Sequence, residues 1–127
     1  MSFDWQDYLT LAEALVRERG YLALEDACLR SAISRAYYAA FVSARNFATA
    51  RDGFIPCHTG ADHGRVKKHF KRSSDRARRQ VGVELGRIWG HRTSADYDDV
   101  FQGALPAATQ ASLQHARNVL STLSTIA

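Results

Sequence analysis

The sequence has few of the residues that cross-link or break a chain. Its 127 residues include two cysteines, two prolines and eight glycines. So little proline and glycine excludes a collagen-like or low-complexity chain. The two cysteines show neither disulfide nor zinc-motif spacing, which agrees with a reducing compartment.

Long apolar runs are missing as well. No stretch approaches the roughly 20 apolar residues of a transmembrane helix. The start of the chain has neither the basic residues nor the apolar core of a secretory signal. We therefore expect a cytoplasmic protein without membrane contact, folded as one domain over residues 1–127.

Common catalytic motifs are also absent. The sequence contains no phosphate-binding P-loop, no Gly-x-Ser-x-Gly and no His-Glu-x-x-His. P-loop hydrolysis, α/β-hydrolase chemistry and zincin proteolysis therefore have no support in the sequence.

The positive charge is concentrated in one segment. The chain carries a net charge of +4, but residues 65–79 alone carry +7 and the remainder −3. Such a segment attracts polyanions, in a salt-sensitive and sequence-independent way when they are nucleic acids; a solvated basic helix is the alternative. The candidate residues for RNA or nucleotide contact are Arg65, Lys67, Lys68, Lys71, Arg72, Arg76, Arg78 and Arg79, together with His63.

Apolar residues recur at steps of three and four along most of the chain, and no stretch shows the alternation of a strand. This pattern predicts an all-α protein, an antiparallel up-and-down bundle of four to five helices. The expected helices cover residues 4–19, 25–51 and 62–72, a stretch from residue 73 or 74 to residue 90, and a last helix that begins at residue 106.

Polar residues suggest where these helices begin and end. Gly20 is expected to stop the first helix, Asp62 to cap the third, and Ser73 or Ser74 to cap the fourth. Three aspartates at positions 96, 98 and 99 would be unfavourable at the negative end of one unbroken helix. We therefore expect a break or bend between Gly90 and Ser94.

Two groups of residues have both a functional and an ordinary structural interpretation, and their spacing favours the structural one. Cys57, His58, His63 and His69 lie close in sequence but match no common zinc pattern, so loop and surface histidines are favoured and no metal or cofactor is predicted. For the two tyrosines at positions 37 and 38, the favoured interpretation is a tyrosine in the core whose hydroxyl has a hydrogen-bond partner. Ser34 and Arg35 form a polar strip beside this pair, which leaves a functional groove as the alternative.

The stretch from His91 to Tyr97 carries the most reactive side chains. Arg92, Asp96 and Asp99 would share one face of a helix. One interpretation is an intrahelical ion pair. The other is an arginine that binds phosphate, with Asp96 orienting it and His91 available for proton transfer.

Three motifs resemble the small stand-alone HEPN domain proteins. They are SRAYYAAF at 34–41, the His-Gly segment that begins at Asp62 and runs to Phe70, and RTSADY at 92–97. Together with the opening FDWQDYL and the last amphipathic helix, the resemblance covers nearly the whole chain.

The resemblance implies a helical bundle that is usually a homodimer. Such proteins are often encoded beside a minimal nucleotidyltransferase in prokaryotic toxin–antitoxin or defence modules. Many are metal-independent ribonucleases with an Arg followed four to six residues later by a His, and in related pairs the partner adenylylates a tyrosine just after that His. Here Arg92 is followed by Asp96 and Tyr97 instead.

Three hypotheses follow. The leading one is a HEPN-family component that acts with a nucleotidyltransferase and contacts RNA or a nucleotide. In it Arg92 binds phosphate, Asp96 orients Arg92 or serves as a weak base, and Tyr97 stacks on a base or accepts a nucleotide. The alternatives are a toxin ribonuclease that uses Arg92 with His91 or Asp96, and a non-catalytic interaction subunit that docks on an acidic partner through Arg76 and Arg78.

Overall fold

The computed structural model describes residues 2–126, and every regular element in that range is an α-helix. The predicted all-α bundle is therefore confirmed. Its five helices are α1 (Asp7–Leu22), α2 (Glu25–Asp52), α3 (Ala61–Lys71), α4 (Arg76–Tyr97) and α5 (Leu105–Thr125).

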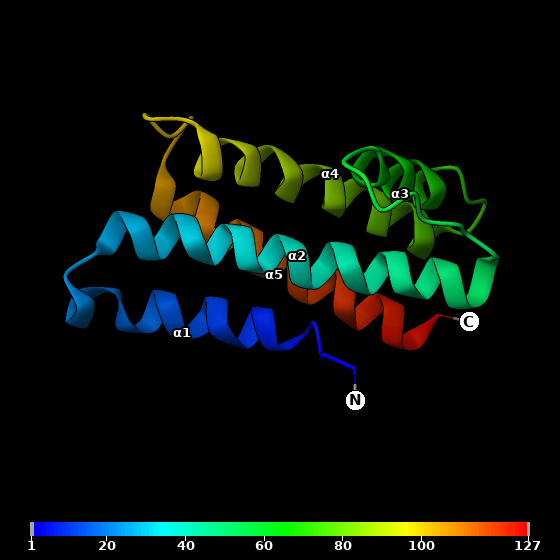
Figure 1. Ribbon diagram of the computed structural model, residues 1–127, viewed down its shortest axis with the longest axis horizontal. Coiled ribbons are helices and arrows are strands. Elements are labelled where there is room, and N and C mark those ends of the chain that lie inside the picture. Colours follow the sequence, from blue (N-terminus) through cyan, green and yellow to red (C-terminus); the bar gives the residue numbers. More distant parts are fainter. Residues whose placement is uncertain (1, 127) are drawn as a thin grey trace.

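The four long helices alternate in direction along the chain, and α2 and α5, which run the same way, lie at the centre of the bundle (Figure 1). Both of these helices contact α1 on one side and α4 on the other. The short α3 packs on α4 and on α2, near the end of the bundle opposite the α1–α2 turn. This arrangement brings three helices, α2, α3 and α4, together along one flank.

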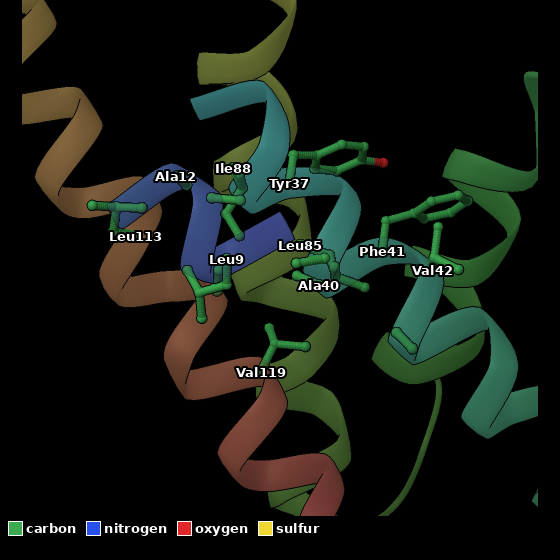
Figure 2. Close-up of a cluster of buried hydrophobic side chains, with 14 of the residues drawn as sticks. Leu9, Ala12, Tyr37, Ala40, Phe41, Val42, Leu85, Ile88, Leu113 and Val119 are labelled. Atoms are coloured by element: carbon green, nitrogen blue, oxygen red, sulfur yellow. The ribbon is translucent and has the colours of Figure 1, made fainter. Parts of the chain in front are cut away.

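One core cluster draws residues from all five helices. The face that α2 presents is rich in alanine, and small side chains allow neighbouring helices to approach closely. Against these small residues Tyr37 is the largest fully buried side chain, with Phe41 one turn further along (Figure 2). The fully buried alanines of α2 are Ala32, Ala36, Ala39, Ala40, Ala44 and Ala48.

The ends of the first helix differ from the prediction. Asp4 lies before α1, and its carboxylate accepts a hydrogen bond from the backbone N–H of Gln6 at 3.0 Å. Gly20 does not stop the helix, which continues to Leu22. The left-handed residue that ends it is Ala23, at φ 55°.

Both predicted caps near the basic segment are also wrong. Gly60 is the N-cap of α3, because the Asp62 carboxylate turns back to the preceding loop instead of capping its own helix. Asp75 is the N-cap of α4 and accepts from the Arg78 N–H at 3.0 Å. Ser73 lies two residues earlier, and its hydroxyl accepts from the Asp75 N–H.

The expected break between Gly90 and Ser94 does not occur, since α4 is continuous from Arg76 to Tyr97. The helix instead ends before Asp98, which has an extended backbone, so two of the three aspartates lie beyond its negative end. The remaining one, Asp96, is neutralised by Arg92 one turn earlier. Asp99 therefore does not share a helical face with Arg92.

Within residues 2–126, no helix combines the length and apolar character needed to cross a membrane. The last helix begins at Leu105, one residue before the predicted start, and Pro106 lies in its first turn, where its missing N–H costs no hydrogen bond.

Two glycines of α4 provide a matched test of the packing. A Cβ on Gly82 would lie 2.8 Å from the Lys71 backbone nitrogen and 2.9 Å from the Lys67 carbonyl oxygen, whereas a Cβ on Gly90 would meet nothing within 4 Å. We expect Gly82→Ala to lower the free energy of unfolding by about 1–3 kcal/mol, because backbone cannot move away cheaply. Gly90→Ala should raise it by about 0.5–1 kcal/mol. Urea denaturation measures both; equal effects would contradict the close α3–α4 contact.

Candidate functional site

Arg92 lies at the centre of a cluster formed where α2 and α4 meet. Its Nε donates to Asp96 at 2.9 Å, and one terminal nitrogen donates to the Tyr38 hydroxyl on α2 at 2.9 Å. The guanidinium also lies near the rings of Tyr38 and Tyr97, at 5.3 and 5.4 Å from their centroids. The ion pair is more enclosed than an ordinary surface pair, with 12% of the Arg92 side chain and 25% of the Asp96 side chain exposed.

The polar strip on α2 continues this cluster. The Ser34 hydroxyl donates to the same Asp96 oxygen at 3.2 Å, which ties α2 to the last turn of α4. Arg35 donates to Ser34 and lies over the Tyr8 ring of α1 at 4.6 Å. Asp96 is thus held from two helices and in turn orients Arg92, the role that the sequence proposed for it.

His63 lies within electrostatic reach of Arg92, although 29 positions separate them in the sequence. Its Nδ1 is 2.6 Å from the Tyr37 hydroxyl, and its ring stacks on Phe41 and meets Trp89 edge-on at centroid distances of 4.4 and 4.5 Å. Burial and the positive charge of Arg92 hold the pKa of His63 below its usual range, so the ring is neutral at pH 7.

Tyr37 completes this arrangement from inside the core. Burial raises the pKa of its phenol, which therefore stays protonated. A neutral His63 that accepts the Tyr37 O–H at Nδ1 carries its own proton on Nε2. The favoured expectation for Tyr37, a core tyrosine with a satisfied hydroxyl, is confirmed, and its partner is a candidate site residue.

A small pocket lies next to this histidine. It has a volume of about 170 Å³ and is bounded by α2, α3 and α4. Of the basic segment only Lys67 lines it. The lining residues are Tyr37, His63, Gly64, Lys67, Leu85 and Trp89.

His91 is partly enclosed on the α5 side of α4, whereas Tyr97 is exposed beside Arg92. The His91 ring stacks near Phe101 at 6.5 Å, and burial together with His115 of α5 lowers its pKa. His91 therefore lies toward α5, whereas Arg92 contacts α2. Tyr97 is 71% exposed and remains beside Arg92.

Three arginines of the basic segment hold the fold together. Arg65 donates to Asp62 at 2.7 Å and to the Ile55 carbonyl at 2.9 Å. Arg79 donates to the carbonyls of Ser73 and Ser74, which lie between α3 and α4.

The third, Arg78, binds Asp52 at the end of α2. Its guanidinium donates to both carboxylate oxygens of Asp52, at 2.7 and 3.2 Å, and His69 lies 2.8 Å from one of them. These hydrogen bonds, that of Arg78 first, hold the pKa of Asp52 below its usual range. Arg78 is therefore unsuitable as a surface residue for testing partner docking, because reversing its charge would break the contact between α4 and α2.

The other basic residues face outward around the same end of the bundle. Lys68 and Arg72 line a hollow of about 450 Å³ beside Phe54, and Lys71 and Arg76 line another of about 300 Å³ on the α3–α4 side. All four of these residues are exposed. The basic segment thus forms a charged surface that begins near Lys67, at the pocket, and extends away from Arg92.

Three of the four residues considered as metal ligands have other partners. The Cys57 Sγ accepts a hydrogen bond from Arg65 at 3.0 Å, while His63 and His69 bind Tyr37 and Asp52. Across residues 2–126, no three His, Cys, Asp or Glu side chains are grouped closely enough to hold a metal ion.

Spacing did not reveal two of the residues at this site. Tyr38 binds Arg92 across 54 positions, and Trp89 meets His63 from another helix. A partner on another helix leaves no periodic signal in the sequence.

Comparisons with known proteins found no relative of this chain. No protein-family model, curated protein or solved structure matches this chain.

The buried Asp62 carboxylate predicts a pH-dependent stability. Its N–H donors and Arg65 outweigh the effect of burial and hold its pKa below the ordinary 3.8. Its contribution is therefore complete above pH 3.8 and is lost as the pH falls through the lowered pKa. We expect Asp62→Asn to cost about 1.5–3 kcal/mol at pH 7 and clearly less near pH 3. Chemical denaturation at both pH values measures this, with the exposed Asp99→Asn as control; an equal loss at both values would contradict it.

Proposed function

We propose that this protein is a HEPN-family component of a prokaryotic toxin–antitoxin or defence module that binds RNA or a nucleotide through Arg92. The observation that carries the proposal is the support of Arg92 from two helices. Asp96, Ser34 and Tyr38 fix its position, and the exposed Tyr97 lies beside it. The same residues belong to two of the three motifs that resemble that family, which supports the assignment.

The chemistry of Arg92 suits a phosphate group. Its two hydrogen bonds to described residues use two of the five N–H donors of a guanidinium. Arginine recognises phosphate with paired N–H groups, and such contacts strengthen where water is partly excluded. A phosphate at the exposed edge of Arg92 would place a neighbouring base within reach of the Tyr97 ring.

The basic surface supplies a second, less specific contribution. Lys68, Lys71, Arg72 and Arg76 are exposed and lie on the α3 end of the same flank. Contacts of this type position a strand without reading its sequence, and they weaken with salt.

The partner and the assembly belong to the same proposal. A minimal nucleotidyltransferase is the partner that the resemblance implies, and a homodimer is the implied assembly. Tyr97 is the residue on which a nucleotide transferred by that partner would be placed, since its ring is 71% exposed beside a phosphate-binding arginine. Intact mass after co-expression tests this, and a Tyr97→Phe chain should then stay unmodified.

Binding of single-stranded RNA tests the role of Arg92. We expect Arg92→Ala and Arg92→Lys each to weaken binding roughly tenfold or more, because a lost charge-assisted contact costs about 1.5–3 kcal/mol. Arg87→Ala, on an exposed position of the same helix, removes one charge and should have a small effect. Fluorescence anisotropy with a labelled oligonucleotide gives the affinities, and thermal melts confirm that the variants fold.

Salt titration gives the complementary measurement. Replacing Lys68 and Arg76 by Ala should reduce the slope of log affinity against log salt by about 1–2. RNA binding that is absent in the unaltered protein, or that is indifferent to both salt and Arg92, would overturn the proposal.

A metal-independent ribonuclease is the second candidate, and one observation favours it. His63 places a neutral imidazole beside Arg92 from a different helix. Histidine is a better base near pH 7 than an ordinary carboxylate. This role requires the tautomer in which His63 Nδ1–H donates to the Tyr37 hydroxyl oxygen, because only then is Nε2 free to accept a proton. We expect RNA cleavage to be lost in His63→Ala and Arg92→Ala and kept in His91→Ala. Absence of cleavage by the unaltered protein would leave RNA binding as the function.

A further inference from the structure

The pocket beside His63 has the size of a single ring. Its volume is about 170 Å³. An engineered cavity of roughly 150 Å³ in another protein accommodates one benzene molecule, whereas pockets for drug-sized ligands are roughly 300 Å³ or more. One six-membered ring therefore fills this space, and part of a fused two-ring system would remain outside it.

Aromatic rings form part of the wall of the pocket, and Trp89 and His63 are the ones that are partly exposed. Trp89 and Tyr37 stand nearly perpendicular to each other at 5.8 Å between centroids, and His63 meets Trp89 edge-on. Leu85 adds an apolar surface. Stacking on aromatic side chains is the usual way in which proteins hold an unpaired base.

Two nitrogen-bearing side chains make the pocket selective for a polar ring. Lys67 reaches the pocket from α3, and its side chain crosses α4 at Gly86, where a Cβ would lie 3.3 Å from Lys67 Cδ. Its ammonium and the neutral His63 ring supply N–H donors. The ring carbonyls of uracil and cytosine are acceptors of the matching kind, and benzene-like rings lack them.

The pocket and the phosphate-binding arginine share a wall. The Arg92 guanidinium lies 5.9 Å from the centroid of the Tyr37 ring, whose hydroxyl holds His63 at the pocket. A base in the pocket and a phosphate on Arg92 would therefore belong to one nucleotide or to neighbouring nucleotides of one strand.

We propose that this pocket binds the pyrimidine base of a ribonucleotide whose phosphate contacts Arg92. The inference rests on the proposed nucleotide-binding function and adds a ligand class, a base-binding site and a size-based selectivity. The base of a uridine or cytidine nucleotide would be enclosed in it, whereas part of a purine base would stay outside.

Isothermal titration calorimetry with mononucleotides tests the selectivity. We expect UMP and CMP to bind at least tenfold more tightly than AMP and GMP. Uridine, which lacks the phosphate, and ribose 5-phosphate, which lacks the base, should each bind at least tenfold more weakly than UMP. Equal affinity for UMP and AMP, or for UMP and ribose 5-phosphate, would overturn the inference.

The same titrations identify the source of the base. An oligouridylate that binds at least tenfold more tightly than UMP indicates a strand of RNA as the ligand. Equal affinity indicates the free nucleotide, and the pocket takes the base in both cases.

Substitution of one glycine fills the pocket, and the same substitution of a second glycine serves as the matched control. Gly64 lines the pocket, and a Cβ there meets no atom within 4 Å; Gly90 is equally open but lies outside the pocket. We expect Gly64→Met to weaken UMP binding at least tenfold and Gly90→Met to leave it unchanged, with no loss of thermal stability in either. Gly64→Ala, which improves helix propensity, serves as a smaller obstruction and should weaken UMP binding by less.

The outcomes separate this inference from the function on which it rests. If RNA binding requires Arg92 but is indifferent to the base, to Gly64→Met and to Lys67→Met, the pocket inference fails and the proposed function stands. If neither RNA nor any nucleotide binds, both fail. Loss of UMP binding in Gly64→Met and Lys67→Met, with pyrimidine preference in the unaltered protein, supports both.

Discussion

The close approach of helices to the alanine-rich face of α2 is the constraint on which the rest of the structure depends. Six fully buried alanines leave room for α1, α4 and α5 to pack around this helix. The two tyrosines at positions 37 and 38 are then enclosed by α3 and α4 rather than exposed. Their hydroxyls bind His63 and Arg92, so the packing of the core also positions the polar groups of the site.

Some basic residues of this protein make internal contacts that stabilise the fold, and others are exposed at the surface. Arg65 and Arg79 bind a carboxylate and backbone carbonyls at the two ends of α3, and Arg78 binds Asp52 at the end of α2. Those contacts fix the segments that position α3 beside α2 and α4. The exposed lysines and arginines remain for solvent or a polyanion, so a count of basic residues overstates the charge available for binding.

The sequence predicted helix positions well because a 3.6-residue apolar period needs only local information. Helix ends were predicted less well. Asp62 and Ser73 have the residue types of caps, but Asp62 instead holds a loop, and Asp75 takes the capping position at α4. The bend expected near Gly90 failed for a related reason. An unfavourable row of aspartates can be avoided by ending the helix at Tyr97, and local spacing does not distinguish these two solutions.

The sequence by itself determined the all-α class, the Arg92–Asp96 pair and the location of the basic segment, because each depends on residues within one or two helical turns. Only the tertiary structure decided that Tyr38 supports Arg92, that His63 lies beside it and that Trp89 lines a pocket with Lys67. Those contacts join helices from distant parts of the chain. Their geometry depends on how α3 and α4 pack on α2, which no periodic pattern in a single helix encodes.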